Sequence, residues 1–307
     1  MMFMTKNTNE GVQGRVLVGI AGGDRPYHAL VRGYQVAKAC EAELVVMRVL
    51  ENPQPLNWML LPHRHADDLA DAIVRDLETI SNGAVWCDEV LPEPLGDRYI
   101  VRRGRMIAQL AEEASRAPTR LIVLPAGVVE ARHAVELAND LQVPVLLARP
   151  QSTNPLVVAA TDLRYPDYPV INEASELAPA LAARLLCVHN RAPQLPGIDP
   201  MMAMFLPLSA IEVEREYGDA QALRAAAASI DRDADTIVTG QSRPVDAILD
   251  VARVQDADLI VVGAARHGSI YRWLTGSTAA AVVRRAKRSV LLTPLDRSQS
   301  GANRDAN

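Results

Sequence analysis

Residues 263–278 carry the clearest chemical signal in the sequence, because glycines, cations and hydroxyls lead there into a segment of helical periodicity. Gly276, Ser277 and Thr278 open that segment. Unpaired backbone N–H groups and the positive end of the helix dipole would therefore face the residues before it. Such a helix start favours an anion, and phosphate fits best. Glycine at 276 lets the backbone approach closely, and the two hydroxyls can donate further hydrogen bonds.

Upstream side chains could add positive charge to this anion site, namely Arg266, His267 and Arg272. The alternative is purely structural: Ser277 caps a helix and the glycines form a turn. Neither G-x-x-x-x-G-K-[ST] nor G-x-G-x-x-G occurs in the chain, which argues against a standard nucleoside triphosphatase and a dinucleotide dehydrogenase.

Short apolar runs alternate with longer segments of helical period, which is typical of parallel strands joined by crossover helices. Strands are predicted at Val16–Ile20, Leu44–Val49, Val85–Val90, Leu121–Leu124, Val145–Ala148, Leu156–Thr161, Leu185–His189, Thr236–Thr239, Leu259–Val262 and Val290–Thr293. Helices are predicted at Tyr27–Ala39, Asp67–Ser81, Arg103–Ser115, Val129–Leu141, Val170–Ala183, Ala210–Ala228, Val245–Val254 and Ser277–Arg288.

The two halves of the 307-residue chain are copies of one unit. Val16–Gly19 corresponds to Val157–Ala160, and Leu121–Val123 corresponds to Leu259–Val261. The polar segment Arg149–Pro155, with two prolines, is the predicted seam. The expected domains are therefore residues 1–150 and 151–295, followed by a polar tail at 296–307 that we expect to be disordered. The region around 263–278 lies beyond a strand's carboxyl end, where open α/β sheets bind ligands.

Composition narrows the class of partner. The chain is 49% hydrophobic and 22% charged, and 32 basic against 37 acidic residues give a net charge of -5. This balance argues against nucleic acid as a partner. No apolar run approaches the roughly 18 residues of a membrane span, so no membrane association is expected. Cys40, Cys87 and Cys187 are widely separated, which suits a reducing cytoplasm.

Four patterns together resemble the universal stress protein family: a strand ending in aspartate, a strand reading LIVVG, a loop close to G-x-x-G-x(9)-G-[ST], and a closing strand SVLLTP. The duplication is similar to the tandem, UspE-like members. The resemblance implies an α/β fold of two tandem Rossmann-like (adenine nucleotide α-hydrolase-like) domains. Each would be a mainly parallel five-stranded sheet with helices on both faces.

The resemblance also implies ATP or AMP, with Mg as an accompanying ion, in the second domain. Asp162 would lie near the adenosine, and Gly263, Gly276 and Ser277 would line the phosphates. The pattern fails at Arg266, where the family has glycine, and Gly268 follows two positions later. Arg266 would either block or bind a phosphate.

The first copy departs further from the family pattern. Ala21 stands at the aspartate position, and the glycine loop is shortened to Pro125–Val129. We expect this copy not to bind nucleotide. Family dimers often pair through the last strand, so Val145–Ala148 and Val290–Thr293 are expected to adjoin in an intramolecular pseudo-dimer, which could dimerise further.

Other clusters have simpler interpretations. His63, His65, Asp67 and Asp68 could hold a metal, but a loop before a helix with an acidic start explains them better. Met201–Leu208 either covers the local core, which we favour, or contacts an apolar ligand or partner. Arg102–Arg105 is interpreted as a solvated helix start, Arg284–Arg288 as a basic helix end, and His189 as a packing residue.

The sequence therefore predicts a cytoplasmic stress-response protein whose second domain binds an adenine nucleotide as a regulatory ligand. No catalytic constellation is evident, so we expect it not to be an enzyme. Two alternatives stay open: a nucleotide-free scaffold or binder of an apolar ligand, and an enzyme that slowly hydrolyses ATP or transfers nucleotide.

Overall fold

The computed structural model describes residues 14–21, 27–50, 98–191, 208–240, 243–264 and 278–295. Contacts divide the chain into two compact units, Met1–Val123 and Leu124–Asn307. The predicted strand Val85–Val90, the predicted helix Asp67–Ser81 and the tail at 296–307 lie outside the described residues. Among the described residues, no helix combines the length and apolar character needed to cross a membrane.

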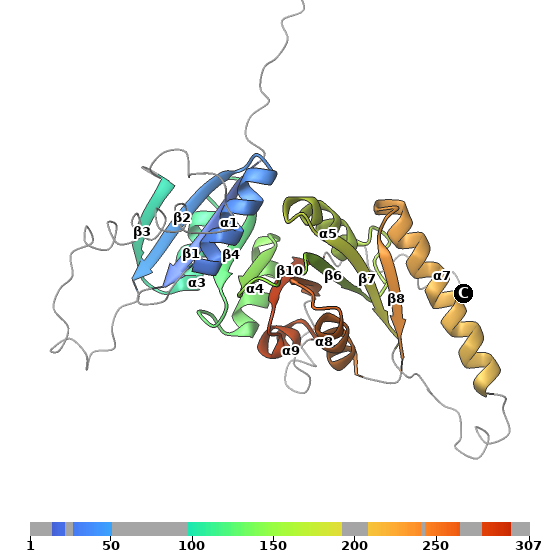
Figure 1. Cartoon of the computed structure of the whole chain (residues 1–307). Coiled ribbons are helices and arrows are strands. Elements are labelled where there is room, and N and C mark those ends of the chain that lie inside the picture. The colour runs from blue at the N-terminus through green and yellow to red at the C-terminus, as the bar shows by residue number, and fades with distance from the viewer. Residues whose placement is uncertain are drawn as a thin grey trace, which may run out of the picture. The chain divides into compact units, whose positions relative to one another are not determined.

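The first unit contains parallel strands in the order β3-β2-β1-β4 (Figure 1). Their bounds are β1 Arg15–Ala21, β2 Glu43–Leu50, β3 Tyr99–Arg103 and β4 Thr119–Pro125, of which the last two residues belong to the second unit. Helix α1 (Tyr27–Ala39) packs closely on one face, since a Cβ on Gly33 would lie 2.3 Å from Val18 Cγ2. Helix α3 (Met106–Ala114) contacts β1 and β2.

A buried ion pair joins α3 to β1. The Arg15 and Glu113 side chains are 9% and 6% exposed, and Arg15 Nη1 lies 3.1 Å from Glu113 Oε1. Arg15 also donates from Nη2 to the Glu113 main-chain oxygen. The second carboxylate oxygen of Glu113 lies 3.4 Å from Arg102 Nη2 and 3.0 Å from Arg116 Nη1. Several cationic donors therefore satisfy this buried carboxylate.

The prediction that Arg102–Arg105 forms a solvated helix start is wrong. Arg102 and Arg103 end strand β3, Gly104 has a φ of 138°, and the helix begins only at Met106. The strand arises because its residues pair with β2, with Met47 opposite Ile100 and Val49 opposite Arg102. Tertiary pairing thus overrides a local charge pattern.

The second unit contains a six-stranded sheet in the order β5-β10-β9-β6-β7-β8. Five of these strands are mutually parallel, and β5 pairs with β10 in the antiparallel direction. The bounds are β5 Val145–Ala148, β6 Leu156–Thr161, β7 Arg184–Asn190, β8 Asp235–Thr239, β9 Leu259–Ala264 and β10 Ser289–Pro294. The central strands are buried, as expected for a parallel sheet covered on both faces.

Helices cover both faces of this sheet (Figure 1). Contacts link α5 (Pro169–Ala180) with α7 (Leu208–Ile230), and α9 (Thr278–Arg285) with both α8 (Pro244–Val254) and α4 (Ala131–Leu141). The strand orders β3-β2-β1-β4 and β8-β7-β6-β9 correspond position by position. The predicted α/β class and the Rossmann-like parallel arrangement are confirmed.

The predicted adjacency of the two closing strands is also confirmed. Val290, Leu291 and Leu292 of β10 lie opposite Leu147, Leu146 and Val145 of β5. Helix α4 contacts β10 and α9 as well. These contacts group the end of the first repeat with the second repeat, so the boundary between compact units falls at residues 123–124. The repeat boundary near residue 150 is a different kind of boundary and stays a prediction.

The predicted seam at Arg149–Pro155 is hydrogen-bonded to the connection between α8 and β9. Ser152 N–H donates to Asp258 Oδ1 over 2.8 Å, and the Ser152 hydroxyl donates to Asp256 Oδ2 over 2.8 Å. Arg288 Nη2 lies 2.6 Å from Asp256 Oδ1. The Ser152 hydroxyl and the Arg288 guanidinium hold the pKa of the Asp256 carboxyl below its ordinary value.

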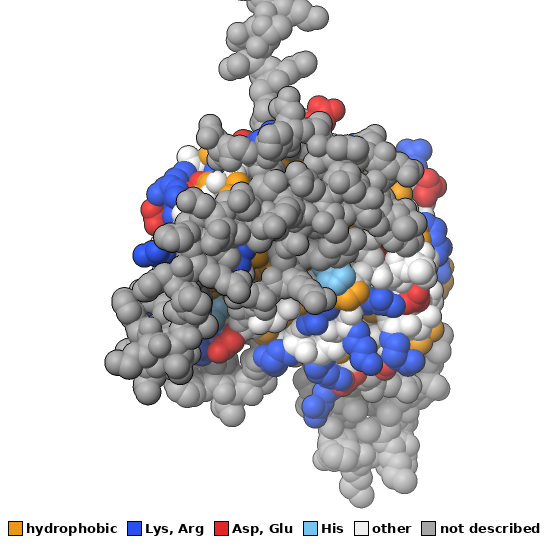
Figure 2. All heavy atoms as spheres, turned by 60° about the vertical axis from the view of Figure 1, so that its left-hand side comes forward, with side chains coloured by type: hydrophobic (Ala, Val, Ile, Leu, Met, Phe, Trp, Pro, Cys, Tyr) orange, Lys and Arg blue, Asp and Glu red, His pale blue; other side chains and the backbone are white. Residues whose placement is uncertain are grey.

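Acidic and basic side chains are mixed on the surface. On the face drawn in Figure 2, Lys and Arg side chains gather in the lower part of the view, with Asp and Glu side chains among them. Two of the described pairs are Arg285 with Asp246 and Arg132 with Glu130. Alternating charges of this kind are typical of a solvated surface.

Candidate functional site

A cavity of about 310 Å³ opens in the second unit where strands β6, β7 and β9 end. It is lined by residues at these carboxyl ends and at the first turns of α5, α8 and α9. Because parallel strands all end at the same edge, residues distant in sequence meet here. Its volume lies at the lower end of the roughly 300–1,000 Å³ range of ligand pockets.

Three of the predicted site residues line this cavity: Asp162, Gly263 and Thr278. Asp162 follows β6, Gly263 is the penultimate residue of β9, and Thr278 opens α9. The other predicted residues, Arg266, His267, Gly268, Gly276 and Ser277, lie outside the described residues. Their assignment to the phosphates stays a prediction.

The Asp162 carboxylate belongs to a tight turn. Its Oδ1 accepts a hydrogen bond of 3.1 Å from the Arg164 backbone N–H, and the Leu163 N–H donates to Thr161 Oγ1 over 3.1 Å. Leu163 has a φ of 59°, in the left-handed region. Asp162 Oδ2 lies 3.7 Å from Arg164 Nε, in an exposed pair. The turn thus directs a partly solvated carboxylate to the cavity and leaves Oδ2 with only a loose partner.

His189 supports the same turn from the neighbouring strand. It lies opposite Thr161 in the β6–β7 register, and its Nδ1 is 3.0 Å from the Thr161 main-chain oxygen. A carbonyl accepts only, so Nδ1 carries the proton. The prediction of a packing role for His189 fits this contact, which also positions the backbone just before Asp162.

Asn190, which is not among the residues predicted from the sequence, also lines the cavity. Its Nδ2 donates to Thr239 Oγ1 over 2.9 Å, and Thr239 Oγ1 lies 3.4 Å from the His189 main-chain oxygen. The available signal was its position directly after His189, at the end of a predicted parallel strand. A polar residue there reaches the same edge as Asp162.

Gly263 is required for packing. A Cβ at this position would lie 2.5 Å from Leu295 Cδ1 and 3.1 Å from Leu295 Cγ. Gly263 lies opposite Thr293 in the β9–β10 register, and Leu295 follows two residues later and also lines the cavity. The glycine therefore lets the Leu295 side chain lie against the strand backbone.

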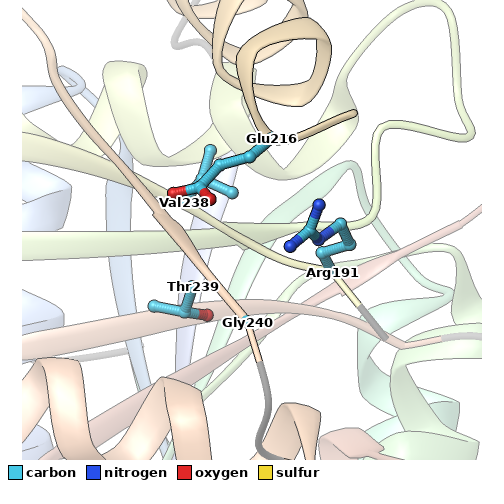
Figure 3. Close-up of a pocket in the computed structure, with 5 residues that line it drawn as sticks. All are labelled: Arg191, Glu216, Val238, Thr239 and Gly240. Atoms are coloured by element: carbon cyan, nitrogen blue, oxygen red, sulfur yellow. The ribbon is translucent and has the colours of Figure 1, made fainter. Parts of the chain in front are cut away.

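A second, smaller pocket of about 140 Å³ lies at the ends of β7 and β8. Figure 3 shows its lining residues: Arg191, Glu216, Val238, Thr239 and Gly240. Thr239 lines this pocket, and its hydrogen-bond partner Asn190 lines the larger cavity. The two hollows are therefore neighbours along the same sheet edge.

The corresponding positions of the first copy have different chemistry. Ala21 ends β1 without a carboxylate, and the β4–α4 connection is a turn with a φ of 95° at Gly127. The Val128 N–H donates to the Pro125 oxygen within this turn over 3.3 Å. That the first copy does not bind nucleotide stays a prediction.

Several other residues singled out in the sequence are not among those that line this cavity. The metal candidates His63, His65, Asp67 and Asp68 and the run Met201–Pro207 lie outside the described residues. Within the described ranges, no group of three His, Cys, Asp or Glu side chains could hold a metal ion. Of the predicted basic helix end Arg284–Arg288, only Arg284 and Arg285 lie in α9, because the helix ends at Arg285 and β10 begins at Ser289. Arg285 Nη2 lies 2.6 Å from Asp246 Oδ1.

The second repeat matches a known family. A model of the Universal stress protein family matches residues 153–294. A comparison with curated proteins gives no significant match.

Solved structures resemble the whole chain. A functionally unknown protein from Pseudomonas aeruginosa PAO1 is 16% identical, with a TM-score of 0.60 over 93% of each chain. A candidate universal stress protein from Pseudomonas aeruginosa UCBPP-PA14 is 17% identical, with a TM-score of 0.58 over 92% of this chain and 93% of that chain. A universal stress protein from Archaeoglobus fulgidus DSM 4304 is 14% identical, with a TM-score of 0.53 over 92% of this chain and 97% of that chain.

At these identities the structural likeness shows the fold, while the family model identifies the second repeat. The strand order, the cavity at the sheet edge and the match over residues 153–294 agree with one another. The family model therefore assigns residues 153–294, the second repeat, to the universal stress protein family.

Proposed function

We propose that this chain is a tandem universal stress protein whose second repeat binds AMP or ATP as a regulatory ligand in a cytoplasmic stress response. One observation carries the proposal. A cavity of about 310 Å³ at the sheet edge is lined by Asp162, Gly263 and Thr278, which come from two strand ends and a helix start.

The lining chemistry suits a nucleoside. The Asp162 carboxylate can accept hydrogen bonds from the ribose hydroxyls, because each hydroxyl has one O–H to donate and a carboxylate offers two acceptor oxygens. Apolar side chains of Val188, Ile248 and Val262 offer a surface for a base. We therefore expect the base of the nucleotide to lie between these apolar side chains, with its ribose at the Asp162 carboxylate.

The phosphate end would lie at the start of α9. Thr278 and Ala279 line the cavity there, and the free N–H groups of a first helical turn attract anions. Gly276, Ser277, Arg266, His267 and Gly268 would complete this end, as the sequence predicts. Mg would accompany ATP through its phosphate oxygens, since Mg is usually bound by substrate phosphates with one or two carboxylates.

We propose binding without catalysis. Among the described residues that line the cavity, the ionisable side chains are Asp162, Arg164 and Tyr165. Thr161 Oγ1 accepts a hydrogen bond from the Leu163 N–H, and among the described contacts neither the Thr161 nor the Thr278 hydroxyl donates to a carboxylate or imidazole that would activate it as a nucleophile. Release of ADP or AMP from ATP at many equivalents per chain would instead support the alternative of an enzyme.

Calorimetric titration of the full chain with AMP, with ATP and with ATP plus Mg tests the proposal. The informative variant is Asp162→Asn, which keeps Oδ1 for the Arg164 N–H but loses the charge. We expect affinity to fall about tenfold or more, the value of one charged hydrogen bond.

Asp167→Ala is the matched control, because Asp167 is exposed in the same loop and does not line the cavity. It should bind as the parent chain does. Absence of measurable heat with all three ligands would contradict the proposal and favour the nucleotide-free scaffold, in which Arg266 fills the phosphate position.

A further inference from the structure

Arg149 connects the end of the first repeat to the last helix of the second repeat. Its Nη2 donates a hydrogen bond of 3.1 Å to the main-chain oxygen of Val283. Val283 lies in the last turn of α9, which ends at Arg285. The last carbonyl groups of a helix have no partner within the helix, and a cation is favourable at this negative end of the helix dipole. Arg149 therefore caps the carboxyl end of α9.

The main chain at Arg149 is held in place as well. Its N–H donates to Ser289 Oγ over 3.1 Å, and the Ser289 hydroxyl lies 3.4 Å from the Arg149 main-chain oxygen. Ser289 is fully buried and begins β10, the strand that follows α9. Strand β5, which ends just before Arg149, pairs with β10. The end of the first repeat therefore contacts both α9 and the strand that follows it.

The Arg149 guanidinium occupies this place without a carboxylate. In the part of the chain that the structure describes, it forms no ion pair, and burial lowers its pKa. Arg285, in the same last turn of α9, is 55% exposed and pairs with Asp246. Water and a neighbouring carboxylate therefore screen the charge of Arg285 much more than that of Arg149. The Arg149 charge acts more strongly on the helix, because charges interact more strongly where water is excluded.

Helix α9 links this cation to the candidate nucleotide cavity. Thr278 and Ala279, in its first turn, line the cavity. The helix has eight residues and is therefore only about 12 Å long, at 1.5 Å per residue. A cation at its last turn and an anion at its first turn both interact favourably with the same dipole. A change at Arg149 can thus reach the phosphate end of the cavity through one short helix.

We infer that Arg149 is a positioning residue for the phosphate of the bound nucleotide, because it holds α9 at its carboxyl end while the first turn of α9 faces the cavity. The inference rests on the proposed nucleotide site. It gives the first repeat, which is not expected to bind nucleotide itself, a part in binding by the second. The effect is specific to the phosphate, because the ribose and the base would contact other elements, through Asp162, Val188 and Ile248.

Competition binding of AMP and of adenosine to the full chain tests the inference, because the two ligands differ only in the phosphate. Arg149→Met removes the cation and its hydrogen bond but keeps a long side chain. We expect it to weaken AMP about three- to tenfold, as for a partly buried cation at a helix end, and adenosine by less than about twofold. Arg149→Lys keeps a charge and a donor and should regain most of the AMP affinity.

Arg285→Met is the matched control, because Arg285 lies in the same helical turn but is exposed and paired. It should bind AMP within about twofold of the parent chain, since exposed ion pairs contribute little. Thermal unfolding of each variant verifies that the chain is folded. A general loss of stability would not change the ratio of the AMP affinity to the adenosine affinity, whereas the loss of a phosphate-positioning residue lowers it.

The outcomes separate the two proposals. If a folded Arg149→Met chain binds AMP as the parent chain does, the nucleotide site stands and the role of Arg149 is overturned. Equal losses for AMP and adenosine overturn it too, as does an equal loss of AMP affinity in Arg285→Met. If adenosine is too weak to compete, the comparison of AMP binding between Arg149→Met and Arg285→Met decides. If AMP does not bind the parent chain, the proposed function itself fails, and this inference fails with it.

Discussion

The His189 ring nitrogen Nδ1 lies 3.0 Å from the main-chain oxygen of Thr161, across the β6–β7 pair. The contact comes at the last paired residue of β6, immediately before Asp162. One imidazole therefore holds the backbone from which the candidate ribose-binding carboxylate projects.

Removing this imidazole should loosen the Asp162 turn. We expect His189→Leu to weaken AMP binding by roughly three- to tenfold, the effect of one lost hydrogen bond of about 0.5–1.5 kcal/mol. Titration calorimetry measures the change. His133→Leu, on α4 and outside the cavity lining, is the control. Unchanged affinity in a folded His189→Leu chain would show that the turn holds without the histidine.

A methyl group at Gly263 should disturb Leu295. The new Cβ would lie 2.5 Å from Leu295 Cδ1, so the leucine has to move. We expect Gly263→Ala to lower the free energy of unfolding by about 1–3 kcal/mol, as overpacking does. The double variant Gly263→Ala with Leu295→Ala should recover part of that loss relative to Leu295→Ala alone. Purely additive effects in urea unfolding would mean that Leu295 is not the obstacle.

Two neighbouring glutamates should differ greatly in their effect on stability. Glu113 is 6% exposed and paired with Arg15, whereas Glu112 is 55% exposed and paired with Arg116. Glu113→Ala leaves buried cationic groups uncompensated, so we expect a loss of about 3–5 kcal/mol in the free energy of unfolding. Glu112→Ala should cost about 1 kcal/mol or less. Similar losses in chemical denaturation would contradict the network around Glu113.

Cys187 should be inert in the folded chain. Burial, with a smaller effect of Asp231, raises the pKa of its thiol from 9.0 to about 12. Iodoacetamide at pH 8 should therefore leave a Cys40→Ser, Cys87→Ser chain unlabelled until urea unfolds it. Rapid labelling of the folded chain would refute the burial of this thiol.

The same thiol makes a defined contribution to the pH dependence of stability. The unfolded thiol ionises above about pH 9, while the folded thiol stays neutral until about pH 12. Its contribution is thus complete below pH 9 and is lost as the pH rises from 9 towards 12. Cys187→Ala should show a shallower fall in stability over that range. Equal slopes for the two chains would argue against the raised pKa.

Much of the fold follows from the sequence because periodicity reports burial. The predicted bounds of α1, β5 and β6 coincide with the observed elements. The repeat is visible in the same way, since corresponding strands bury similar apolar runs. The pairing of β5 with β10, expected from the family resemblance, agrees with the observed register. Strand β3 was missed, because Tyr99–Arg103 becomes a strand only by pairing with β2.

The residues of the candidate site also fall into two groups: those expected from the sequence and those found only in the structure. Asp162 and Gly263 were expected from the resemblance to the universal stress protein family, and Thr278 from its place at the start of a predicted helix beyond a strand's carboxyl end. Asn190 follows the end of a predicted strand, but the contacts of Asn190 and Leu295 depend on neighbours distant in the chain: Thr239 for the amide and the Gly263 backbone for the leucine. The sequence alone determined the α/β repeat and the edge at which a ligand would bind. Only the tertiary structure decided which side chains face that cavity and how they are oriented, because hydrogen bonds and close packing between separate strands set those directions.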